Sequence, residues 1–240
     1  MSILVSIFCI TYNHEKYIVD ALKSFLMQRT NFEFEILVHD DASTDNTANI
    51  IREYAKLHNC IKPIFQKENQ YSQGRDIIMS HLYHKRKGKY IALCEGDDYW
   101  TDPYKLQKQV DYMEDHPKCS LCFHAAAIVN TNKQLTGNFI RPYHISCIVP
   151  IERFIEDGAA IICRTESMLF RAKSMEGINK VFSSKSFGDW LWQLFLATKG
   201  DVYYIDKVMS AYRIGVPNSW SNNVRQKSES EFKQLSQIKK

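Results

Sequence analysis

The sequence contains no apolar stretch of the roughly 20 residues that a membrane-spanning helix needs. No basic segment precedes the apolar run near its start, which passes directly into Thr11-Tyr12-Asn13. We therefore expect neither a signal peptide nor a transmembrane helix. Glycine is scarce, with 9 residues in 240, and no GxGxxG motif follows any predicted strand. That absence argues against a dinucleotide-dependent dehydrogenase.

A strong charge imbalance is also missing, because the formal net charge is only +4. Nucleic-acid binding usually requires a basic stripe on one face, so we do not expect a nucleic-acid partner. The small positive excess is compatible with an anionic ligand or with an acidic membrane surface.

The seven cysteines are odd in number and show no disulfide-scaffold spacing. Most lie in apolar runs, where cysteine behaves as a small hydrophobic residue, so we expect a reducing, cytoplasmic location. Cys119 and Cys122 form one CxxC near His124, whereas a zinc site would need a second pair. We therefore interpret both as side chains of a half-buried strand.

Apolar, β-rich runs alternate with amphipathic helical stretches in the first half of the chain. The predicted strands there are 3–10, 34–38, 61–65 and 90–94. Helices are expected at 15–29, after Asp45, at 77–83 and from Pro103 onward. This order predicts an α/β fold with a Rossmann-like, mostly parallel central sheet flanked by helices.

The second half of the chain is more mixed. We predict strands at 119–129, 167–171, 202–205 and 208–212, a loop at 130–146, and helices at 151–155 and 189–198. The inward residues of the last helix are expected to be Trp190, Leu191, Leu194 and Phe195. No linker is visible, so we predict one domain over 1–220, with halves 1–117 and 118–220 and a polar tail at 221–240.

Three polar clusters directly follow predicted strands: Thr11–Asn13, Asp40–Asp41 and Glu95–Asp98. In open parallel sheets, ligands bind outside the carboxyl ends of the strands. We therefore expect the three clusters to meet at one edge of the sheet.

Glu95, Asp97 and Asp98 place three carboxylates within four positions. Such mutual repulsion is best tolerated around a cation, and oxygen ligands suit Mg²⁺ or Mn²⁺ bridging to phosphates. The alternative is a solvated acidic turn that caps the helix near Pro103.

The remaining candidates each have a structural alternative. Asp40 and Asp41 could bind a base or a ribose hydroxyl, and the alternative is that Asp41, Ser43 and Asp45 only cap the next helix. Tyr12 could stack on a base, or pack on its own fold. Arg75 could meet a phosphate, or be an ordinary surface residue. Asp189 could be a general base, or a partner of a helix dipole.

In combination, these segments resemble glycosyltransferase family 2, whose members are inverting enzymes of the GT-A fold. The resemblance extends to about Ser221 and rests on these stretches: VSIFCITYNHEKYIVDALKSFLMQ (5–28), FEILVHDDASTDNTANII (34–51), KYIALCEGDDYWTDPYKLQKQV (89–110), SMLFRA (167–172), SFGDWLWQLFLATKG (186–200) and SAYR (210–213).

The resemblance implies roles for the candidate residues. The first half would bind a nucleotide-sugar, expected to be a UDP-sugar, and the second half a glycan or lipid-linked acceptor. The implied donor-binding residues are Thr11, Tyr12, Asn13, Asp40, Asp41, Arg75, Glu95 and Asp97. Asp97 and Asp98, in the position of the DxD motif, would hold Mn²⁺ or Mg²⁺, and Asp189 would be the catalytic base.

The sequence departs from the family pattern at two places. Glu95 replaces the usual first Asp, and Gly188 stands where an acidic residue often precedes the base. No QxxRW motif is present, which argues against a processive polymer synthase. The family implies surface-polysaccharide assembly in the cytoplasm, with peripheral contact to the inner membrane. The rival interpretations are a sugar nucleotidyltransferase and a non-catalytic nucleotide-binding protein.

Overall fold

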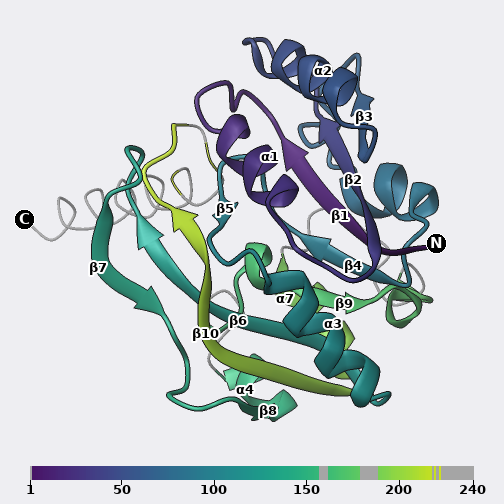
Figure 1. The fold of residues 1–240 in the computed structure, drawn as a ribbon, viewed down its shortest axis with the longest axis vertical. Coiled ribbons are helices and arrows are strands. Elements are labelled where there is room, and N and C mark those ends of the chain that lie inside the picture. The colour runs from purple at the N-terminus through teal and green to yellow at the C-terminus, as the bar shows by residue number, and fades with distance from the viewer. Residues whose placement is uncertain (1, 157–161, 179–188, 218, 220–221, 223–240) are drawn as a thin grey trace, which may run out of the picture.

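The computed structural model describes residues 2–156, 162–178, 189–217, 219 and 222 (Figure 1). The first half contains β1 (Ile3–Thr11), α1 (Ile18–Leu26), β2 (Glu33–Asp40), α2 (Thr47–Leu57), β3 (Ile61–Phe65), η1 (Ile78–Leu82), η2 (Tyr83–Lys85), β4 (Tyr90–Leu93), β5 (Tyr99–Trp100) and α3 (Lys105–Asp115). The predicted helix at 77–83 is a π-helical turn, η1, that continues into the 3₁₀ turn η2.

The second half contains β6 (Cys119–Val129), β7 (Leu135–Ile140), β8 (Cys147–Val149), α4 (Ile151–Glu156), η3 (Thr165–Ser167), β9 (Leu169–Arg171), η4 (Ala172–Met175), α7 (Asp189–Ala197) and β10 (Asp201–Arg213). None of the helices in the described residues combines the length and apolarity that crossing a membrane would require.

One sheet runs through both halves in the order β3-β2-β1-β4-β9-β6-β10-β5, with β7 beside β6 and β8 beside β10. The strands β3, β2, β1 and β4 are parallel, as predicted for the first half. The strand β9 is antiparallel to both β4 and β6, and it joins the two halves into one sheet. The predicted α/β fold with a Rossmann-like sheet is confirmed.

Two predictions about the second half were wrong. The expected loop at 130–146 contains β7, whose residues are almost all exposed and so lack the apolar alternation that signals a strand. The strands predicted at 202–205 and 208–212 are one long strand, β10. Its pairing with β6 shifts register between Ile205 and Val208, so a bulge interrupts the apolar pattern without ending the strand.

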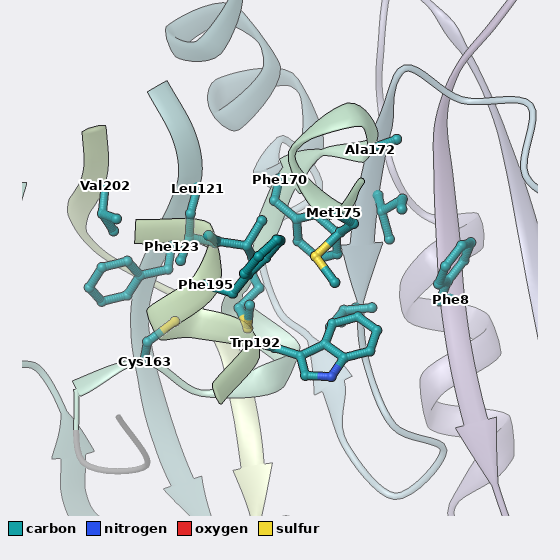
Figure 2. Close-up of a cluster of buried hydrophobic side chains, with 14 of the residues drawn as sticks. Phe8, Leu121, Phe123, Cys163, Phe170, Ala172, Met175, Trp192, Phe195 and Val202 are labelled. Atoms are coloured by element: carbon teal, nitrogen blue, oxygen red, sulfur yellow. The ribbon is translucent and has the colours of Figure 1, made fainter. Parts of the chain in front are cut away.

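Helices cover both faces of the sheet, and successive residues of β1 point to opposite cores. Ile7 and Cys9 lie in the core that α1, α2 and α3 cover, whereas Phe8 lies in the core that η1, α4 and α7 cover. Figure 2 shows Trp192 and Phe195 of α7 in the second of these cores. Cys119 and Cys122 of β6 are both buried in the first core.

The face that α7 buries agrees with the predicted one only in part. Trp190 is 40% exposed, and its indole Nε1 donates to the carbonyl of Phe154 at 2.8 Å. Phe195 is buried as predicted, but the other buried side chains are those of Trp192, Gln193 and Leu196. Because apolar residues surround this short helix almost completely, its sequence does not determine which stripe faces the core.

Candidate functional site

The three polar clusters lie side by side around the end of β1. The N–H of Asp41 donates to the carbonyl of Thr11 at 3.0 Å, on the β2 side. The N–H of Gly96 donates to the carbonyl of Ile10 at 2.9 Å, on the β4 side. A Cβ on Gly96 would lie 2.7 Å from Thr11 Oγ1, so glycine allows this close approach. The expected convergence at one sheet edge is therefore present.

Asn13 joins the loops that follow β1 and β2. Its backbone is left-handed, with φ of 55°. Its N–H donates to Ser43 Oγ at 2.9 Å, and its side-chain Oδ1 accepts from the N–H of Thr44 at 2.8 Å. This amide therefore shapes the site, whereas the neighbouring Tyr12 side chain is 39% exposed. The donor-binding roles of both residues stay predictions.

Asp40 is buried, and its carboxylate accepts hydrogen bonds within the turn that follows β2. One carboxylate oxygen accepts from Ser43 Oγ at 2.5 Å and the other accepts from the Ser43 N–H at 3.2 Å. Burial raises the pKa of Asp40, and these two hydrogen bonds oppose the rise. Asp40 does not cap α2, since the first-turn N–H of Thr47 is bound by Asp45 at 3.0 Å.

Asp41 is also buried, and both of its oxygens bind the loop at 66–75. Oδ1 accepts from the N–H of Gln70 at 2.7 Å, and Oδ2 accepts from the N–H of Tyr71 at 3.0 Å. The Gln70 side-chain oxygen in turn accepts from Arg75 Nη1 at 2.7 Å. Asp41 therefore positions the loop that carries Arg75. A carboxylate oxygen has a second lone pair, so a further ligand contact is open to it.

Glu95, Asp97 and Asp98 form an acidic group in the turn after β4. Each can offer one carboxylate oxygen such that the three oxygens lie within 4.8 Å of one another. Glu95 and Asp97 are half-buried, Asp98 is 1% exposed, and His14 Nε2 lies 3.8 Å from the Asp97 carboxylate. Within the described ranges this is the one group of acidic, His or Cys ligands with metal-binding spacing.

Asp98 is the member of the acidic group whose buried carboxylate is only partly hydrogen-bonded. Its Oδ1 accepts from the main-chain N–H of Arg213 at 2.6 Å, but its buried Oδ2 has no hydrogen-bond partner. Burial raises the pKa of Asp98 well above its usual range, and the carboxylates of Glu166, Asp97 and Glu95 add to the rise. A buried carboxylate is costly unless it is paired or coordinates a metal.

The donor set of this acidic group fits a hard divalent cation. All the available atoms are carboxylate oxygens, which suit Mg²⁺ or Mn²⁺ rather than Zn²⁺. A cation here would offset the repulsion among the three acids and would bind the unpartnered Oδ2 of Asp98. Phosphate oxygens of a ligand could complete its coordination.

Asp189 is the first residue of α7, and its side chain lies outside the described part of the structure. One turn further along, Gln193 Nε2 donates to the carbonyl of Cys163 at 3.0 Å. The helix start is therefore tied to the segment that carries Arg164 and Glu166. Gly188 and residues 157–161, in the expected acceptor region, also lie outside the description.

Sequence reasoning missed Gln70, Tyr71, Arg213 and Glu166 as part of this region. Gln70 and Tyr71 contribute through backbone amides, which carry no sequence signal. Glu166 lies far along the chain from the acidic turn, and it comes near because β9, which follows it, pairs with β4, which precedes the turn. No local pattern could have identified these residues.

Sequence relatives match most of the chain. An uncharacterised protein of Mycobacterium tuberculosis is 32% identical over 219 residues, covering 90% of this chain and 60% of the relative. TuaG of Bacillus subtilis, named a putative teichuronic acid biosynthesis glycosyltransferase, is 32% identical over 120 residues, covering 50% and 45%. The chain thus spans about 60% of the length of its mycobacterial relatives.

Solved structures share the fold at low sequence identity. Staphylococcus aureus TarS 1–349 with UDP-GlcNAc has a TM-score of 0.68 and 21% identity, covering 88% of this chain and 58% of that one. The mannosyltransferase PcManGT of Pyrobaculum calidifontis, solved with GDP-Man and Mn²⁺, has a TM-score of 0.64 and 15% identity, covering 94% and 61%. The predicted GT-A fold is confirmed by this likeness.

The family model described as glycosyl transferase family 2 matches residues 6–177, a range that includes the second part of β1, the loop at 66–75 and the whole acidic turn. This match agrees with the sheet topology and with the polar clusters at its edge. The chain belongs to glycosyl transferase family 2.

Proposed function

We propose that the chain is a glycosyltransferase that transfers a sugar from a nucleoside diphosphate sugar, a UDP-sugar, to an acceptor hydroxyl in polysaccharide biosynthesis, with inversion at the anomeric carbon. The observation that carries the proposal is the acidic group after β4, where Asp98 Oδ2 is buried without a partner. The group lies beside the ends of β1 and β2, where a nucleotide would bind.

Relatives and neighbours support the choice of donor. TarS has been solved with UDP and with UDP-GlcNAc, and PcManGT with GDP-Man and Mn²⁺. TuaG is named for teichuronic acid biosynthesis, a polysaccharide pathway. We therefore propose a UDP-sugar as the donor of this chain, with Mn²⁺ or Mg²⁺ held by Asp97 and Asp98.

Donor binding would begin at the ends of β1 and β2. Thr11 is buried at the end of β1, and the exposed ring of Tyr12 provides a flat apolar face for a base. Asp41 holds the loop at 66–75 and would accept an N–H of the base with a remaining lone pair. Arg75, oriented by Gln70, would bind a base carbonyl or a phosphate.

Transfer would occur as a single displacement. The Asp189 carboxylate takes the proton of the acceptor hydroxyl while its oxygen bonds to the anomeric carbon. The bond from that carbon to the phosphate oxygen breaks on the opposite face, and the nucleoside diphosphate leaves. A divalent cation bound at the acidic group would supply positive charge to offset that of the leaving diphosphate.

The acceptor is proposed to be a glycan or a lipid-linked saccharide, bound by the second half. A cytoplasmic location, with peripheral contact to the inner membrane, remains part of the proposal. Cys9, Cys94, Cys119 and Cys122 are buried as thiols in the core, and buried thiols suit a reducing compartment.

A panel of sugar nucleotides tests the proposal. The chain is incubated with UDP-sugars and GDP-Man, with and without Mn²⁺, and thermal stability and released nucleoside diphosphate are both measured. A matching donor should raise the melting temperature only with Mn²⁺, because a ligand that binds the folded state stabilises it. Glu114→Gln is the control, since this carboxylate of α3 lies outside the acidic group and pairs with Lys89, just before β4.

The rivals give different products. A sugar nucleotidyltransferase would release pyrophosphate from a nucleoside triphosphate and a sugar phosphate, and a binding protein would shift in stability without turnover. The anomeric configuration of the product, read by NMR, decides whether transfer inverts. A chain that neither binds nor turns over any donor with Mn²⁺ would refute the proposal.

A further inference from the structure

Glu166 is a buried carboxylate that belongs to none of the three polar clusters. It lies in η3, just before β9, and is 1% exposed. Its Oε1 accepts from Ser210 Oγ at 3.4 Å, and its main-chain carbonyl accepts from the indole Nε1 of Trp100 at 2.9 Å. Burying an ionised carboxylate costs several kcal/mol of folding free energy after relaxation. A charge at this position must therefore be offset by a nearby cation or serve a function.

Glu166 and Asp98 both pack on the short ladder between β5 and β10. In that ladder Trp100 pairs with Ser210 and Tyr99 pairs with Ala211. Asp98, directly before β5, binds the N–H of Arg213 at the end of β10, and Glu166 contacts both members of the Trp100–Ser210 pair. The two buried carboxylates therefore hold neighbouring parts of one small ladder.

Two cations lie in the same region. The Arg164 guanidinium carbon lies 3.5 Å from the ring centroid of Tyr212, in β10. Lys105 Nζ is buried, lies 4.1 Å from the ring centroid of Trp100 and donates to Gln109 at 2.8 Å. Arg164 lowers the pKa of Glu166, whereas burial, the larger effect, raises it. Four carboxylates share this region, since, in addition to burial, those of Glu166, Asp97 and Glu95 each raise the pKa of Asp98.

We propose that Glu166 is a positioning residue of the cation site, a fourth carboxylate behind Asp98 that increases its affinity for a divalent cation. The inference rests on the proposed function, because it requires the acidic group to bind a cation. The Glu166 charge, kept from water, attracts a cation across the low-dielectric interior more strongly than a surface charge would. Through Ser210 and Trp100 it also supports the ladder that holds Asp98.

Glu166→Gln keeps the shape of the side chain and removes its charge. Replacing a residue that supports a metal ligand typically lowers metal affinity about 10–100-fold. We therefore expect the Kd for Mn²⁺ to rise about tenfold or more in this variant, as measured by calorimetry with UDP present. Saturating Mn²⁺ should restore kcat while the Mn²⁺ concentration for half-activation stays high. Damage to the fold would not be reversed by the metal.

Three further variants separate charge from packing. Ser210→Ala removes the hydrogen bond and leaves the charge, so its Mn²⁺ affinity should stay close to wild type. Glu166→Asp retains the charge and should recover most of the affinity. Lys105→Met removes an opposing positive charge and should tighten Mn²⁺ binding about threefold at pH 6.5. Tightening cannot arise from misfolding, so this variant keeps the test valid if Glu166→Gln folds poorly.

The two proposals fail in different ways. Wild-type protein that binds Mn²⁺ together with UDP, while Glu166→Gln binds it equally well, overturns the role of Glu166 and leaves the cation site. Equal losses in Glu166→Asp and Glu166→Gln would assign Glu166 to packing alone. Wild-type protein that binds UDP without any effect of Mn²⁺ refutes the cation site, and the role of Glu166 with it.

Discussion

The main-chain N–H of Arg213 donates a 2.6 Å hydrogen bond to Oδ1 of Asp98, a residue 115 positions earlier in the chain. The bond joins the end of β10 to the acidic turn and leaves Asp98 Oδ2 without a partner. The last strand of the sheet thus orients a proposed metal ligand. The Arg213 side chain is itself buried, and its Nη2 donates to Asp20 of α1 at 2.9 Å.

Asp98→Asn should weaken metal-dependent UDP binding and at the same time raise the melting temperature. The amide oxygen can still accept from Arg213, but the negative charge is lost, so Mn²⁺-dependent UDP affinity should fall about 100-fold, the upper range for residues that support a metal. Because burial raises the pKa of Asp98, its ionised form destabilises the fold at neutral pH, and the variant without metal should melt at a higher temperature. Calorimetry and thermal unfolding measure the two effects, and unchanged UDP affinity with Mn²⁺ would count against the site.

Asp41→Ala should release the loop at 66–75. Hydrogen bonds to a charged acceptor contribute about 1.5–3 kcal/mol each, and the variant leaves the N–H groups of Gln70 and Tyr71 without Asp41. Amide hydrogen exchange at these two positions should become at least about tenfold faster, since local opening costs less. Ser72→Ala, which removes a hydrogen bond within the same loop, is the control. Unchanged exchange would show that other contacts hold the loop.

Asp189→Asn should abolish transfer and leave donor binding nearly intact. General-base catalysis typically contributes about 10²–10⁴-fold, so kcat should fall by that range while the UDP affinity stays within about twofold of wild type. Turnover with the best donor and calorimetry with UDP provide the two readouts. Full activity in this variant would remove Asp189 from the role of base.

Lys105 should make stability depend on pH. Burial lowers the pKa of Lys105 from 10.5 to about 7, and the neighbouring Cys94, Cys122 and Glu166 oppose the fall. Between these two values the unfolded state binds more protons, so the free energy of unfolding rises with pH. Below about pH 7, Lys105 is charged in both states and the full cost of burying the charge is present.

Lys105→Met should remove this dependence. The difference in unfolding free energy between variant and wild type should be largest, in favour of the variant, near pH 6.5 and should shrink toward pH 9. Urea unfolding at four pH values between these limits measures it. A difference that does not change with pH would mean that the Lys105 charge is compensated in the folded state.

Much of the first half could be predicted from local pattern. The strands β1, β2 and β4 are buried on both faces over most of their length, so their apolar runs stand out between polar turns. The second half was harder, because β7 is exposed and β10 continues through a bulge. The buried face of α7 was predicted correctly only at Phe195, since the apolar residues of this helix form no single stripe.

The sequence by itself determined that polar residues end β1, β2 and β4 and that parallel pairing would gather them at one edge. Local chemistry also marked Glu95, Asp97 and Asp98 as an acidic group. Only the tertiary structure decided that both oxygens of Asp41 bind backbone amides, that Asp98 binds the N–H of Arg213, and that Glu166 is buried beside Ser210 and Trp100. These contacts join residues dozens of positions apart through backbone groups and strand pairing, which leave no local trace in the order of side chains.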